Sequence, residues 1–70
     1  MMPLTLADPG KELTIQRIGG KPEVRQHLET MGFVPGATVT LISVNEGDVI
    51  VNIKGIRVAI SKEMSEKIMV

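Results

Sequence analysis

The sequence predicts a mainly β fold: a small, partly open barrel of about five short strands with one inserted helix and a short helical turn near the C-terminus. Val39 and Leu41 alternate with threonines in 38–41, and Val49, Val51 and Ile53 alternate with Ile50 and Asn52, a pattern of period two that is typical of half-buried strands. Residues 22–31 instead have apolar positions at helical spacing. The segment Met31–Gly36 then ends that helix and starts a strand within six residues.

Size and charge limit what this chain can be. Seventy residues make one domain, 1–70, which buries only about 60% of its unfolded surface, so its stability depends on close packing. Because it has no Cys and only one His, it is not expected to be a small scaffold held together by disulfides or by a structural metal. Eight basic and eight acidic residues argue against nucleic acid or an anionic membrane as partner. No stretch resembles a signal peptide or a membrane span, so we expect a soluble, cytoplasmic protein.

The first twenty residues predict extended structure. Leucines alternate with other residues in Leu4–Ala7, which indicates a short opening strand or extended arm. Asp8–Gly10 has turn chemistry. Lys11–Ile18 follows as one strand, with a β-bulge near Gln16–Arg17 needed to correct its alternation. Gly19–Gly20 ends it.

The helix Pro22–Met31 is expected to stop at a glycine. Proline suits the first helical position, and Gly32 suits the left-handed position just past the last turn. Phe33 then meets Leu28, the hydrophobic contact of a Schellman ending. Because Pro favours the second and Gly the third position of a type II turn, Val34–Ala37 is predicted to be such a turn.

The remaining chain predicts strands and a short helix. After the strand around Val39 and Leu41, Asn45–Asp48 is a turn and Val49–Ile53 a strand. Lys54–Gly55 then forms a two-residue hairpin turn to the strand Ile56–Ile60.

Ser61 resembles a helix N-cap, so Lys62–Lys67 should form one or two turns with Met64 and Ile68 facing inward. Met69–Val70 returns to strand and closes the sheet.

The residues offer almost no catalytic chemistry, so we predict no enzyme. No Cys is present to act as a thiol nucleophile, and with His27 as the single His, a Ser–His or His–His arrangement has little material. A metal site is the sharper alternative: Glu23, His27 and Met31 are four apart and line one helix face with an oxygen, a nitrogen and a thioether. The simpler interpretation is that Glu23 serves the helix start, His27 is solvated and Met31 packs.

Two binding alternatives also remain. Lys54, Arg57 and Lys62 could form a basic patch for nucleic acid, but no Tyr or Trp accompanies them, and a solvated surface is the simpler interpretation. Phe33 is either buried as the anchor of the helix or partly exposed with the two residues that follow, which would make an apolar protein-binding patch.

The whole chain resembles the FeoA family of small accessory proteins in ferrous iron transport. The residues that carry the resemblance, in chain order, are Leu4, Leu6, Pro9, Gly10, Ile15, Ile18, Arg25, Leu28, Met31, Gly32, Phe33, Pro35, Gly36, Val39, Val58, Ala59, Ile60, Ile68 and Val70. Ser65 departs from the pattern, because the family more often has Ala there.

The resemblance implies an SH3-like barrel and a non-enzymatic, cytoplasmic role with the membrane transporter FeoB, which has a cytosolic GTP-binding domain. The expected partner surface comprises Arg25, Met31, Phe33 and Pro35, with the arginine at the rim and the apolar side chains as anchor. A weakly bound Fe²⁺ or other divalent transition metal is the alternative ligand. We expect a monomer or a weak homodimer, since short exposed strands could pair two copies.

Overall fold

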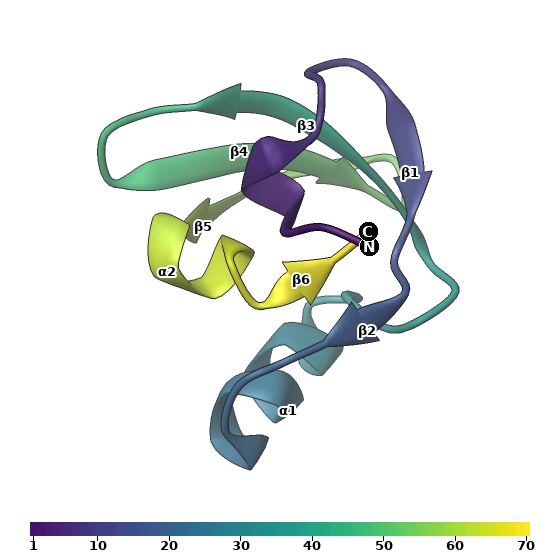
Figure 1. Ribbon diagram of the computed structural model, residues 1–70, viewed down its shortest axis with the longest axis vertical. Helices are drawn as coiled ribbons and strands as arrows, with labels where there is room; N and C mark the ends of the chain where they lie inside the picture. The colour runs from purple at the N-terminus through teal and green to yellow at the C-terminus, as the bar shows by residue number, and fades with distance from the viewer.

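The computed structural model describes residues 1–70 and has six short strands and three helical segments (Figure 1). In chain order, these are η1 (Leu4–Leu6), β1 (Glu12–Thr14), β2 (Arg17–Ile18), α1 (Pro22–Thr30), β3 (Thr38–Val44), β4 (Asp48–Ile53), β5 (Ile56–Ser61), α2 (Lys62–Ser65) and β6 (Ile68–Met69). The predicted mainly β class and the inserted helix are confirmed, with six strands in place of about five.

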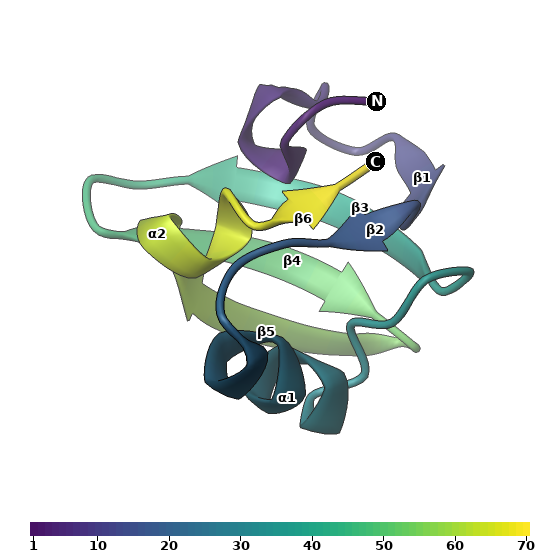
Figure 2. The ribbon, with the colours of Figure 1, turned by 60° about the horizontal axis from the view of Figure 1, so that its bottom comes forward.

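The strands form two antiparallel sheets that curl around one core. The larger sheet has the order β1-β3-β4-β5, and the smaller consists of β2 and β6 (Figure 2). A register shift between Leu41 and Ser43 places a bulge in β3, which bends the large sheet. The sheets do not join into one closed ladder, so the barrel is partly open, as predicted.

Prediction of a single strand over Lys11–Ile18 was wrong. The chain passes from the large sheet to the small one in the middle of this segment: the Ile15 N–H donates to the Ala37 carbonyl at 2.8 Å, and the next N–H, of Gln16, donates to the Met69 carbonyl at 2.8 Å. Ile15 is almost completely buried at this point. The irregular alternation that suggested a bulge therefore marks the switch between two sheets.

The extended arm predicted for Leu4–Ala7 was also wrong, because Leu4–Leu6 is a 3₁₀ turn. The turn places Leu4 and Ala7, three residues apart, on its inner side, and both are buried while Leu6 is 69% exposed. Before the turn, Met2 and Val70 exchange backbone hydrogen bonds of 2.9 and 2.8 Å, so the two chain ends lie together (Figure 1).

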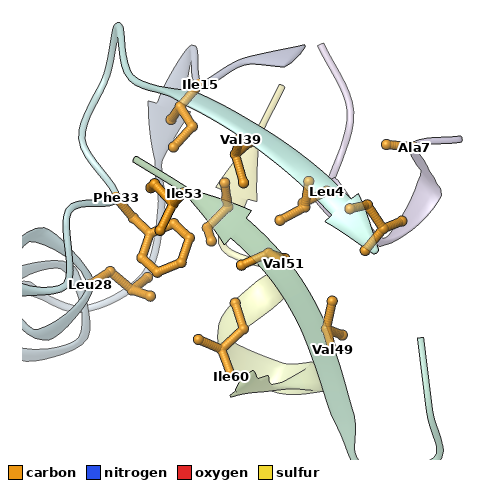
Figure 3. Packing of buried hydrophobic residues seen from close by; sticks show 12 residues of the cluster. Leu4, Ala7, Ile15, Leu28, Phe33, Val39, Val49, Val51, Ile53 and Ile60 are labelled. Carbon is orange, nitrogen blue, oxygen red and sulfur yellow. The ribbon is translucent and has the colours of Figure 1, made fainter. Parts of the chain in front are cut away.

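The core consists of aliphatic side chains and one aromatic ring, that of Phe33 (Figure 3). Its twelve members are Leu4, Ala7, Ile15, Leu28, Phe33, Val39, Leu41, Val49, Val51, Ile53, Ile60 and Ile68. The core-facing positions of β3 and β4 are those that the alternation predicts. Leu28 is the one fully buried residue of α1, so the helix is attached to the barrel by a narrow contact.

The turns around β5 confirm the local sequence signals. Lys54 and Gly55 both have positive φ, 52° and 76°, as a two-residue hairpin turn requires. Ser61 caps α2, because its Oγ accepts a 3.1 Å hydrogen bond from the Met64 N–H. The helix ends at Ser65, earlier than the predicted Lys67. The Ser65 hydroxyl is fully buried and donates to the Lys62 carbonyl at 2.6 Å, so a polar side chain is accommodated here.

Candidate functional site

The segment 28–37, here called the elbow, joins α1 to β3 and has the predicted Schellman geometry. The Phe33 N–H donates to the Leu28 carbonyl and the Gly32 N–H to the Glu29 carbonyl, both at 2.9 Å. Gly32 has φ of 99°, where a side chain would strain the backbone. Leu28 and Phe33 are both fully buried, so the contact that defines the motif is part of the core (Figure 3).

The second half of the elbow is tied to the point where the chain changes sheets. Ala37 donates its N–H to the Val34 carbonyl at 3.0 Å, which closes the predicted turn, and Gly36 has φ of 91° as a type II turn requires. Gly36 also donates its N–H to the Ile15 carbonyl at 2.8 Å. The elbow is therefore fixed both to the core and to the sheet edge.

An open hollow of about 570 Å³ lies between α1 and the elbow. Its lining combines apolar groups from three parts of the chain with polar side chains of one helix face; the residues are Ile18, Pro22, Arg25, Gln26, Glu29, Phe33, Val34 and Pro35. We call this set the α1–elbow surface. One cation and one anion belong to it, so it carries no formal net charge.

The predicted partner residues occupy different depths of this surface. Arg25 and Pro35 are exposed and line the hollow. Phe33 also lines it, but its side chain is fully buried, which decides between the two predicted states of this residue in favour of the buried anchor. Met31 is half-buried against the core and does not line the hollow. Direct contact with a partner is thus open to Arg25 and Pro35, while Phe33 shapes the surface from below.

Val34 was expected here only if Phe33 were partly exposed, and four further residues of the surface were not predicted from the sequence. Pro22, Gln26 and Glu29 share a helix face with Arg25, since their spacing follows i, i+3, i+4 and i+7. That spacing was a readable signal. Ile18 could not have been found in this way, because it reaches the hollow only through the pairing of β2 with β6.

The metal candidates do not come together with further strong ligands. Glu23 and His27 are exposed on α1, and Met31 is half-buried. The structure contains no group of three or more His, Cys, Asp or Glu side chains placed to hold a metal ion. The metal hypothesis therefore depends on a methionine thioether as third donor and stays a prediction.

The basic residues considered for nucleic acid lie along the full length of β5. Lys54 precedes the strand, Lys62 follows it, and Arg57 lies near its start. Six residues of strand extend about 20 Å, so the three cations do not form one compact patch. None of the helices is long and apolar enough to cross a membrane.

The FeoA domain family model matches residues 2–70 of this chain. The chain belongs to the FeoA family. A curated relative from Methanocaldococcus jannaschii, named putative Fe(2+) transport protein A, is 34% identical over 70 residues, which are all of this chain and 85% of the relative.

Solved FeoA structures agree with the fold. The crystal structure of an iron uptake regulatory protein, FeoA, is 35% identical and superposes with a TM-score of 0.87 over 97% of this chain and 92% of that one. Iron(II) transport protein A from Clostridium thermocellum is 26% identical, with a TM-score of 0.87 over 97% of this chain and 43% of its own. A manganese-dependent transcriptional repressor, 18% identical with a TM-score of 0.83, shows the same fold in 38% of its length.

Proposed function

We propose that this FeoA-family chain is a non-enzymatic, cytoplasmic accessory protein of ferrous iron transport that binds the cytosolic GTP-binding part of a FeoB-type membrane transporter. The observation that carries the proposal is the family match over residues 2–70, supported by the 34% identical relative named for Fe(2+) transport. The side chains support a binding role over a catalytic one, because the hollow has no His or Cys and only one carboxylate, Glu29.

The α1–elbow surface is the proposed contact. It combines an apolar floor with a polar rim, the arrangement that protein interfaces commonly have. The floor is held by the buried Phe33 and by backbone hydrogen bonds on both sides of the turn, so the surface is rigid before a partner arrives. Arg25 is the rim residue whose charge a partner carboxylate would meet, as arginine is enriched in such contacts.

The test is a titration of isotope-labelled chain with the soluble GTP-binding domain of the FeoB from the same organism, followed by amide NMR. We expect shifted amides to gather in α1 and residues 33–37. Arg25→Glu should weaken the affinity about tenfold, because a rim charge is reversed without loss of a buried group.

Lys11→Glu is the matched control. Lys11 is an exposed cation directly before β1, which lies at the opposite end of the molecule from α1 in Figure 1 and Figure 2. Lys11→Glu changes the charge of the chain by the same amount as Arg25→Glu and should leave the affinity for the GTP-binding domain unchanged. The proposal would be contradicted if no binding occurs at a millimolar concentration of the GTP-binding domain, or if both variants lose the same amount of affinity.

A further inference from the structure

Strand β5 forms an open edge of the large sheet. It pairs only with β4, and Ile53 faces Ile56 across the two-residue turn. Because such a closing pair exchanges both of its backbone hydrogen bonds, the N–H and C=O groups of every second residue from Ile56 point toward β4. Those of Arg57 and Ala59 point away from the sheet. No backbone hydrogen bond formed elsewhere in the chain uses Arg57 or Ala59, and both residues are exposed.

The side chains of this edge are more apolar than an unprotected edge usually allows. Ile56 is 63% exposed, Val58 is half-buried and Ala59 is exposed. Proteins commonly protect edge strands by making them short, charged or interrupted by proline. On β5 the single charged residue is Arg57, and no proline occurs.

The opposite edge of the same sheet is protected. Strand β1 has only three residues, and its Glu12 and Thr14 are exposed and polar. Two residues after β1, the chain has already passed to the small sheet through the hydrogen bond of Gln16. The contrast within one sheet indicates that the β5 edge is built to pair.

We infer that β5 pairs antiparallel with β5 of a second copy of this chain, with the two-fold axis at Val58. When two copies of β5 pair through their free edges, a residue whose backbone N–H and C=O point away from β4 must lie opposite another such residue, because only these groups can form the new hydrogen bonds. An axis at Arg57 sets Arg57 against itself, which places like charges directly opposite each other. An axis at Ala59 sets Val58 against Ile60 but leaves Ile56 opposite Lys62, beyond the end of the strand.

The axis at Val58 satisfies both the backbone and the side chains. Arg57 then exchanges two hydrogen bonds with Ala59 of the second copy, and the symmetry-related pair does the same. Val58 lies opposite Val58, and the exposed Ile56 lies opposite Ile60, so β-branched side chains meet on the core-facing side. The stem of each arginine crosses a small alanine while its guanidinium stays in water.

This dimer goes beyond the proposed function and uses other residues than the α1–elbow surface. One added strand pair buries less than the roughly 1,200 Å² typical of stable complexes, so the association is weak. We expect a monomer at micromolar concentration and a rising dimer fraction toward millimolar concentration.

The charge at residue 59 tests the register. Ala59 is exposed on the outer face, so its substitution does not disturb the core. Ala59→Glu sets a carboxylate against each Arg57 and should strengthen the dimer about fivefold, while Ala59→Lys should weaken it by a similar factor. Sedimentation equilibrium of the full chain from micromolar to millimolar concentration measures both.

Ala59→Pro tests the backbone contact. It removes an N–H that points away from β4, a substitution that edge strands tolerate, and should abolish the dimer. Ala59→Thr keeps the N–H and is the matched control; it should dimerise, with both variants checked by far-UV circular dichroism. The proposal is overturned if the chain stays monomeric at millimolar concentration or if Ala59→Pro dimerises like Ala59→Thr. Weakening by both Glu and Lys at residue 59 also overturns it, because that result places the axis at Ala59.

Discussion

The elbow and the β4–β5 hairpin turn both use left-handed residues, but they are held in different ways. In the elbow both positive-φ positions are glycines, 32 and 36, and the fully buried Leu28 and Phe33 anchor the segment. In the hairpin Lys54 takes a φ of 52°, a conformation that usually goes to Asn, Asp or Gly, and the next residue along the strand, Ile56, is largely exposed. Core residues therefore lie on both sides of Gly32 in the elbow, whereas the hairpin turn has a core residue only on its β4 side, Ile53, and otherwise depends on the strand ladder.

The two segments also touch. A Cβ placed on Gly32 would lie 3.7 Å from Cδ and from Cε of Lys54, so the lysine stem covers the glycine that ends α1. This is an ordinary packing distance, and the conformation of Gly32, not crowding, decides what can replace it. The comparison thus predicts large effects from anchor residues, intermediate effects from left-handed glycines and a small gain from improving Lys54.

Phe33→Ala should have the largest effect. Removing the only aromatic ring from a fully buried site costs about 3–5 kcal/mol, close to the whole stability of so small a domain. Urea unfolding followed by far-UV circular dichroism measures the loss. Phe33→Leu keeps most of the volume and should cost less than half as much. A cooperative transition within about 1 kcal/mol of wild type for Phe33→Ala would show that the elbow does not depend on the core.

Gly32→Ala should rank second, at about 2 kcal/mol, because a side chain at φ of 99° strains the backbone that positions Phe33. Gly47→Ala is the matched control, since Gly47 has no positive φ and no atom within 4 Å of a built Cβ. It should change stability by less than about 1 kcal/mol, in the stabilising direction if at all. Equal losses of stability from Gly32→Ala and Gly47→Ala, measured by thermal unfolding, would show that the positive φ of Gly32 is not the cause of the effect.

Gly55→Ala should cost about 1 kcal/mol, also through its positive φ of 76°. The site is open, with nothing within 4 Å of a built Cβ, and Ile56, the residue that follows, is largely exposed. The cost should therefore be smaller than at Gly32. The free energies of the two variants, taken from the same urea series, test this order directly, and the reverse order would remove the proposed distinction between core-held and ladder-held turns.

Lys54→Asn should have the smallest effect and the opposite sign. Asn adopts the left-handed conformation more readily, so the hairpin should gain up to about 0.5 kcal/mol, partly offset by loss of the lysine stem over Gly32. Lys62→Asn, at an exposed position in the first turn of α2, is the control without a left-handed backbone and should not stabilise. A clear loss of stability from Lys54→Asn would mean that packing of the lysine stem over Gly32 contributes more than the left-handed strain at residue 54 costs.

Local signals in the sequence predicted most of the elbow and the hairpin. The glycine positions, the Pro–Gly pair and the Leu28–Phe33 contact each depend on residues less than six apart, where backbone preference and turn chemistry decide. The same is true of the Ser61 cap. Three of the four predicted partner residues line the hollow, which follows from their place on one helix and its immediate end.

Other features could not be read from neighbouring residues. Whether Lys11–Ile18 is one bulged strand or two strands depends on Ala37 and Met69, which supply the carbonyls for Ile15 and Gln16. The 3₁₀ turn at Leu4 likewise exists because the core accepts Leu4 and Ala7 on one side. Ile18 likewise lines the candidate surface because β2 pairs with β6, a strand that is distant in the sequence.

The sequence by itself determined the turns at Gly32, at Pro35–Gly36 and at Lys54–Gly55, the Ser61 cap of α2, and which faces of β3 and β4 are apolar, because these depend on local dihedral preferences and on alternation. Only the tertiary structure decided that Phe33 is buried, that the second strand belongs to a separate sheet and that β5 keeps an open edge. The reason is that burial and strand pairing are set by distant partners, which a local pattern does not specify.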